Sequence, residues 1–152
     1  MKNKFLPIVL SSALLAGCGL LTNFDEFSNK LGVSMPSKYE KLFHGGESAI
    51  DSSLSYDIYS VKEEWKLEYQ TQYQTDFEEP FELDKYIDAI NGYEPLDIPE
   101  EYHIPHSSSL DWVCKREAGK TRNYEWLLIF DSSTKMLYAL DSTHQWFHQG
   151  IL

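Results

Sequence analysis

The sequence predicts a single small α+β domain, an antiparallel sheet with short helices on one face. The clearest observation is in the C-terminal third, where residues 110–117, 124–130 and 135–140 have the pattern of three successive strands joined by turns. Upstream, short segments with apolar residues at helical spacing precede and follow a segment with period-two alternation. The chain also contains 8 Phe, 10 Tyr and 4 Trp. Such a content predicts a folded core rather than a disordered tether.

Two short helices are expected at the start of this domain. The first covers residues 24–31, where apolar residues recur at helical spacing between a capping Asn23 and a terminating Gly32. The second is expected to begin at Pro36 and to end at the Gly45-Gly46 pair. Its apolar residues, also at helical spacing, are Tyr39, Leu42 and Phe43.

The middle of the chain combines strand and helix patterns. Residues 54–61 alternate apolar and polar side chains, which predicts a strand. Residues 65–74 fit both periods, but their Gln, Thr and Tyr content favours a strand that pairs with the preceding one across a turn at 62–64. A third helix is expected over 83–90, closed by Asn91-Gly92.

The remaining segments complete the expected sheet. Residues 93–109 contain Pro95, Pro99 and Pro105, so they are expected to form an extended, irregular crossing. Residues 124–130 are nearly all apolar, which predicts a central strand covered on both faces.

The N-terminus has the three parts of an export signal. Lys2 and Lys4 form a cationic start, and an apolar run follows over residues 5–15. A membrane-spanning helix needs about 20 apolar residues, so this run is too short to span a bilayer. It ends in Leu15-Ala16-Gly17-Cys18, a sequence that resembles the lipobox of bacterial lipoproteins.

This resemblance implies a lipid anchor on Cys18. Residues 1–17 would be a lipoprotein signal peptide, residues 18–22 a lipidated tether, and residues 23–152 the single globular domain. Because each buried CH₂ group contributes about 0.8 kcal/mol, the two or three acyl chains of a bacterial lipoprotein would hold the domain at the membrane. In that family an Asp after the Cys favours the inner membrane. Gly19 follows here, which implies the periplasmic side of the outer membrane in a Gram-negative host.

A lipidated Cys18 leaves Cys114 without a disulfide partner in its own chain. Cys114 shares one face of the expected strand with Leu110 and Trp112, so we expect a buried, inert thiol. A reactive or intermolecular Cys114 is the alternative.

The acidic residues are unevenly distributed. The formal net charge is −11, and Lys85 is the one basic residue within the acid-rich stretch 76–101. This charge disfavours nucleic acid and anionic headgroups and favours a basic protein partner, unless the stretch is only a solvated surface. The residues expected to bind that partner are Asp76, Glu78, Glu79, Glu82 and Asp84, with exposed Tyr86 or Tyr93.

The sequence predicts no catalytic residues, no metal site and no cofactor. His144 and His148 are four residues apart, but the pair lacks the Glu that a helical zinc-protease motif requires. His103 and His106 could join them only through folding. The serines at 107–109 lack the glycine elbow of a catalytic serine.

The final hairpin, residues 126–130 and 135–140, resembles the end of small exported α+β immunity-type lipoproteins. These proteins neutralise antibacterial toxins that arrive in the periplasm. We therefore expect a lipid-anchored, non-catalytic protein-binding module, with immunity against a periplasmic toxin as one role. A structural or assembly lipoprotein of an envelope machine is the alternative, and a small envelope hydrolase is a third hypothesis.

Overall fold

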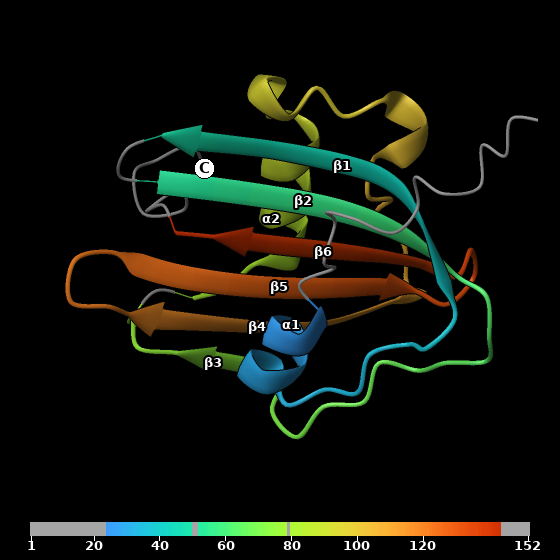
Figure 1. The fold of residues 1–152 in the computed structure, drawn as a ribbon, viewed down its shortest axis with the longest axis horizontal. Coiled ribbons are helices and arrows are strands. Elements are labelled where there is room, and N and C mark those ends of the chain that lie inside the picture. The colour runs from blue at the N-terminus through green and yellow to red at the C-terminus, as the bar shows by residue number, and fades with distance from the viewer. Residues whose placement is uncertain (1–23, 50–51, 79, 144–152) are drawn as a thin grey trace, which may run out of the picture.

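The computed structural model describes residues 24–49, 52–78 and 80–143. They form a single small α+β domain around a six-stranded sheet with the order β1-β2-β6-β5-β4-β3 (Figure 1). Every neighbouring pair is antiparallel except β3 and β4, which are parallel. The predicted α+β fold class is confirmed.

The elements are α1 (Phe24–Leu31), β1 (Tyr39–Ala49), β2 (Ser52–Val61), β3 (Tyr73–Thr75), α2 (Leu83–Asn91), the 3-10 turns η1 (Glu94–Leu96) and η2 (Glu100–Tyr102), β4 (Leu110–Ala118), β5 (Asn123–Asp131) and β6 (Met136–Ser142).

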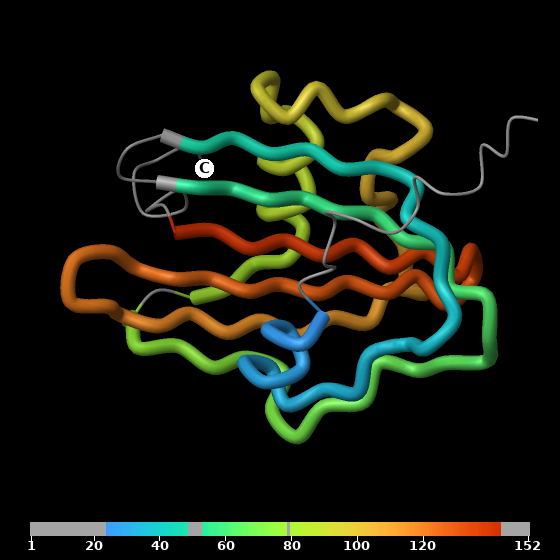
Figure 2. The backbone as a smooth tube through the Cα atoms, in the orientation of Figure 1, coloured from blue at the N-terminus to red at the C-terminus, as the bar shows by residue number. Residues whose placement is uncertain are grey.

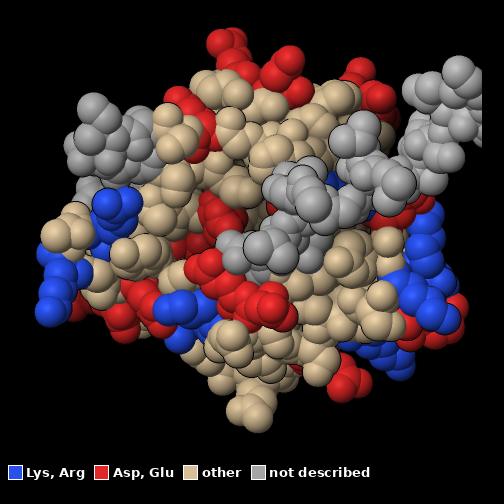
Figure 3. Space-filling view, in the orientation of Figure 1, with Lys and Arg blue, Asp and Glu red and all other residues tan. Residues whose placement is uncertain are grey.

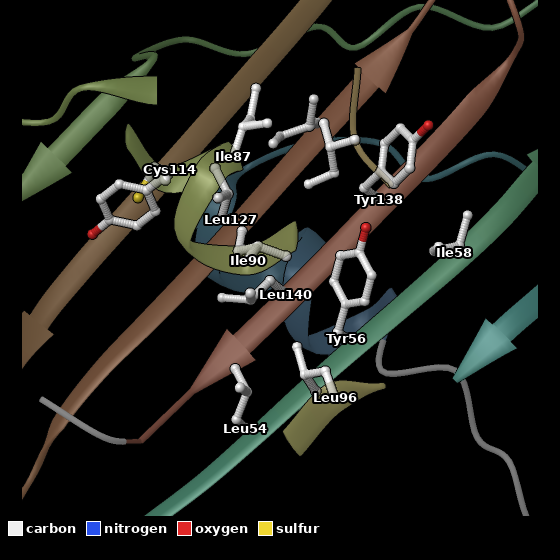
Figure 4. Close-up of a cluster of buried hydrophobic side chains, with 13 residues drawn as sticks. Leu54, Tyr56, Ile58, Ile87, Ile90, Leu96, Cys114, Leu127, Tyr138 and Leu140 are labelled. Carbon is white, nitrogen blue, oxygen red and sulfur yellow. The ribbon is translucent and has the colours of Figure 1, made fainter. Parts of the chain in front are cut away.

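The two helices lie on opposite faces of the sheet rather than together on one. Phe24, Phe27 and Leu31 of α1 join the core on one side, whereas Tyr86 and Ile87 of α2 join the core on the other. The cause is β5, whose side chains are apolar on both faces, so that each face needs a cover. The expectation of a central strand buried on both sides is confirmed. Figure 4 shows the core beneath α2, where strands β2, β4, β5 and β6 all contribute side chains.

The helix expected from Pro36 to Gly46 is wrong, because β1 occupies this segment. It pairs with β2 over its whole length, from Tyr39 opposite Val61 to Ala49 opposite Ser52. A β-bulge between Lys41 and Phe43 interrupts the period of two. The bulge places Tyr39 in the core on the α1 side and Phe43 in the core on the α2 side, which explains why the apolar residues mimicked helical spacing.

The hairpin expected between residues 54–61 and 65–74 is also wrong. Both edges of β2 are occupied, by β1 and by β6, so no edge remains for a third strand. Residues 62–72 instead run irregularly beside residues 34–38 (Figure 2), where the Glu63 carboxylate accepts hydrogen bonds from the backbone N–H groups of Ser37 and Lys38. The strand that follows, β3, is only three residues long.

The helix expected over 83–90 is confirmed, as is the largely irregular crossing that follows it. The Asn91 side chain ties the two together. Its Nδ2 donates to the Ile104 carbonyl, and its Oδ1 accepts from the Ile104 N–H, both at 2.9 Å. The crossing is therefore fixed against α2 and leads the chain back to β4.

Candidate protein-binding surface

Four half-buried aromatic side chains lie on or beside β3, β4 and the start of α2; Tyr73, Phe81 and Trp112 pack against the core on the α2 side, and Phe77 lies beside Arg116. We call Tyr73, Phe77, Phe81 and Trp112 the aromatic cluster. The Phe81 ring lies 4.5 Å from the Trp112 ring and 5.2 Å from the Tyr73 ring, measured between centroids. Each ring is partly accessible, so the cluster combines a fixed geometry with apolar area that faces solvent.

A buried ion pair lies beneath the aromatic cluster. Arg116 and Glu125 occupy facing positions on β4 and β5, and each is 4% exposed. Arg116 Nε lies 2.9 Å from Glu125 Oε2, which also accepts a 2.8 Å hydrogen bond from the Tyr86 hydroxyl. Among the described residues, no group hydrogen-bonds the other carboxylate oxygen, Oε1. We call Arg116, Glu125 and Tyr86 the buried network.

The buried network holds the aromatic cluster in place. The Arg116 guanidinium donates to the Tyr73 hydroxyl at 3.4 Å and lies 5.4 Å from the centre of the Phe77 ring. Tyr86 packs against Phe81 with 4.3 Å between ring centroids. Because Arg116 and Tyr86 are themselves buried and both contact Glu125, they give the rings of Tyr73, Phe77 and Phe81 ordered neighbours.

Burial dominates the electrostatics of this interior. It raises the pKa of Glu125 to about 7, although Arg116 and the Tyr86 hydroxyl both favour the ionised carboxylate. Burial also raises the pKa of the Cys114 thiol, which is 1% exposed. The expectation that Cys114 is buried is confirmed, and its raised pKa disfavours the nucleophilic thiolate.

The predicted partner-binding acids flank the aromatic cluster in sequence, and the four that the structure describes, Asp76, Glu78, Glu82 and Asp84, are exposed. Glu78 has no ion pair or side-chain hydrogen bond among the described residues. Three others are partly engaged, since Asp76 accepts the Ala118 N–H, Glu82 pairs with Lys85, and Asp84 lies 3.3 Å from His106. Glu79 lies outside the described residues.

Tyr86 is not an exposed contact residue, so this part of the prediction is wrong. It is 2% exposed and points into the core, because it lies on the face of α2 that packs against the sheet. Tyr93 is half-buried, and its hydroxyl donates to Glu47 of β1 at 2.6 Å. Since β1 and β3 form opposite edges of the six-stranded sheet, the Tyr93 hydroxyl lies at the β1 edge, whereas Tyr73 of the aromatic cluster lies at the β3 edge.

The rest of the acidic stretch follows α2 to the β1 edge. Figure 3 shows acidic side chains along the upper border of the molecule, where the turns after α2 lie in Figure 1. The exposed acids of these turns are Glu94, Asp97, Glu100 and Glu101. Their carboxylates form no ion pairs over the described part of the chain.

The histidines of the described residues are dispersed. His103 hydrogen-bonds the backbone carbonyl of Ile98, whereas His106 reaches Asp88 on α2 at 2.8 Å. His144 and His148 fall outside the part of the chain that the structure describes. Within that part, no group of three or more His, Cys, Asp or Glu side chains is placed to hold a metal ion. Neither described helix has the length and apolar character needed to cross a bilayer.

The sequence predicts the acidic residues of this surface, but neither the aromatic cluster nor the buried network was predicted from it. A signal was present in the alternation of the strands. Arg116 falls on the same side of β4 as Cys114, and Glu125 falls on the same side of β5 as Leu127. Opposite charges at core-facing positions of two adjacent strands predict a buried ion pair.

Comparisons of the chain with protein-family models, with curated proteins and with solved structures gave no match.

Proposed function

We propose that this chain is a lipid-anchored envelope protein whose domain binds a basic protein partner without catalysis. The aromatic cluster forms the centre of the binding surface, and Asp76, Glu78, Glu82 and Asp84 form its acidic rim. The observation that carries this proposal is the position of half-buried, fixed aromatic rings among exposed carboxylates at one edge of the sheet.

This arrangement has the chemistry of a protein interface. Aromatic side chains in a fixed centre supply most of the binding energy in such interfaces, and a polar rim excludes water around them. The acidic residues increase the rate of encounter with a cationic partner at low salt and disfavour anionic ones. A basic toxin that reaches the envelope is one partner that fits, as the resemblance of the C-terminal hairpin to immunity-type lipoproteins implies.

The anchor is tested separately from the binding surface. Cys18 lies outside the described residues, so the support for its lipidation is the lipobox resemblance. Radiolabelled palmitate should be incorporated by the wild-type chain and not by a Cys18→Ser variant, which should leave the membrane fraction. Equal labelling of both would refute the anchor.

Binding is tested with the full-length chain in detergent, used to capture proteins from envelope extracts of its host. The Glu78→Lys/Glu82→Lys variant should lose the specific partner that the wild type retains, because two rim charges are reversed. Asp25→Lys/Glu40→Lys is the matched control, since it changes the net charge equally at exposed positions on α1 and β1.

Phe81→Leu tests the aromatic centre of the same surface. It should weaken capture by about tenfold or more, which corresponds to roughly 1.4 kcal/mol. Capture that survives both the rim reversal and Phe81→Leu would refute the proposed surface.

A further inference from the structure

A cleft of about 760 Å³ opens on the other side of the molecule, at the end of the sheet where β5 turns into β6. One wall is the irregular segment after β2, which contributes Trp65 and Glu68. The sheet contributes Asp111 and Phe130. Phe130 belongs to the core on the α1 side, whereas the aromatic cluster lies on the α2 side. The cleft volume is typical of a small-molecule site, about 300–1,000 Å³, and the cleft is separate from the proposed protein-binding surface.

Trp65 is fixed as an aromatic wall of this cleft. Its Nε1 donates to the backbone carbonyl of Ser34 at 3.0 Å, and its ring packs edge-on against Phe130 at 4.9 Å between centroids. The side chain is nevertheless half-buried, so part of the ring remains accessible to a ligand. Because the ring is already oriented, stacking on it costs little side-chain entropy.

The cleft is lined by both positively and negatively charged side chains. Lys135 is paired with Glu64 on one side. Lys66, Glu68 and Asp111 are exposed and form no ion pair among the described residues. The cleft therefore offers one free ammonium group and two free carboxylates beside an aromatic ring.

From this lining we infer that the cleft binds a short neutral oligosaccharide. A sugar ring has an apolar C–H face that can stack on Trp65, and its hydroxyl groups both donate and accept hydrogen bonds. The carboxylates of Glu68 and Asp111 are acceptors for hydroxyl donors, and the Lys66 ammonium is a donor for hydroxyl oxygens. A strongly anionic or cationic ligand would meet a like charge in the same cleft, which disfavours it.

The experiment uses the full-length protein in a detergent without a sugar headgroup. Three neutral disaccharides, cellobiose, maltose and N,N′-diacetylchitobiose, are titrated at millimolar concentrations and followed by tryptophan fluorescence and saturation-transfer NMR. At least one should bind saturably. Trp65→Ala should weaken that binding by about tenfold or more, and Glu68→Gln/Asp111→Asn should weaken it by a smaller factor.

Matched controls separate local effects from unfolding. Tyr102→Ala removes a half-buried aromatic ring on the opposite side of the sheet, and Asp25→Asn removes an exposed acid on α1. Both should bind the disaccharide as the wild type does. The inference is overturned if none of the three disaccharides binds, or if Trp65→Ala binds unchanged while its circular dichroism remains native. Failure of the protein-partner experiment leaves this result unaffected, because the two sites share no residue.

Discussion

Arg116 and Glu125 stand directly opposite each other on β4 and β5, with 2.9 Å between Arg116 Nε and Glu125 Oε2 in the interior of the domain. Isolated charges are rarely buried, because the loss of hydration costs several kcal/mol for each ion. Here each charge is stabilised by the opposite charge beside it, and Arg116 also contacts Tyr73 and Phe77 of the aromatic cluster. The structural role of this pair leads to the first prediction.

Removing Glu125 alone should be more destabilising than removing both members of the pair. Glu125→Leu should lower the free energy of unfolding by about 3–5 kcal/mol, because it leaves the Arg116 charge buried and uncompensated. Arg116→Met should cost less, because burial already raises the pKa of Glu125 and its carboxyl can bind a proton once the guanidinium is gone. The double variant should be less destabilised than the Glu125→Leu variant, because no buried charge is left without a partner. Urea unfolding of all four proteins measures this cycle, and simple additivity would contradict the buried pairing.

The turn between β5 and β6 contains a carboxylate that should make the stability of the domain depend on pH in acid. Asp131 accepts hydrogen bonds from Ser109, Ser133 and Thr134. Burial alone would raise the pKa of Asp131, but these hydrogen bonds lower it to about 2. A carboxyl whose pKa is depressed in the folded state contributes stability above its unfolded pKa and loses it as the pH falls through the folded pKa.

Asp131→Asn should therefore destabilise the domain by about 2 kcal/mol at neutral pH. The difference from the wild type should shrink as the pH falls from about 4 to about 2. Urea midpoints across this range measure the effect, with the exposed Asp25→Asn as the control. A pH-independent difference would show that the charge of Asp131 is not responsible.

His106 should titrate above the ordinary range of histidine. Its Nε2 lies 2.8 Å from Asp88 and its Nδ1 lies 3.3 Å from Asp84, and these carboxylates raise the pKa of the imidazole. The contact is strongest when His106 is protonated, so its contribution is lost as the pH rises through this raised pKa. Histidine NMR shifts should give a midpoint above that of an exposed histidine, and Asp88→Asn should lower it. An unchanged midpoint in Asp88→Asn would show that Asp88 does not raise the pKa of His106.

Neither cysteine should react with a thiol reagent in the native protein. Cys114 is buried and its pKa is raised, so a thiol reagent should not label it in the native protein. If Cys18 is lipidated, the purified full-length chain should show no reactive thiol when native and a single one in denaturant. Rapid labelling of the native Cys18→Ser variant would show that Cys114 is accessible.

The sequence predicted the segments whose period was unbroken. The strands β2, β4 and β6 and the helix α2 follow from uninterrupted alternation or helical spacing, and β5 follows from its continuous apolar run. The segment of β1 was mistaken for a helix because a bulge shifts its alternation by one residue. Residues 65–74 were assigned to a hairpin because local propensity cannot show that β6, far away in the sequence, occupies the edge of β2.

The exposed acids of the candidate site could be predicted from the sequence, but the aromatic residues that the fold brings together could not. Exposed acids are visible in composition, so Glu78 and Glu82 were identified correctly as exposed. Tyr86 was misassigned although it shares the buried face of α2 with Ile87 and Ile90, which helical spacing alone indicates. The half-buried rings of the aromatic cluster come from β3, β4 and the segment before α2, and only the folded chain brings them together.

The strand order also constrains how this chain can acquire its structure. Over the described residues, the hairpin of β1 and β2 joins the rest of the sheet only through β6, the last of the strands there. An isolated two-stranded hairpin is marginal in water, so the N-terminal third gains a stable neighbour only when the C-terminal strand is present. Such distant pairing slows folding, because a long loop must close before the contacts form. The sheet of this domain is therefore complete only after residues 136–142 have joined it, so a late segment of the chain decides when the first hairpin becomes stable.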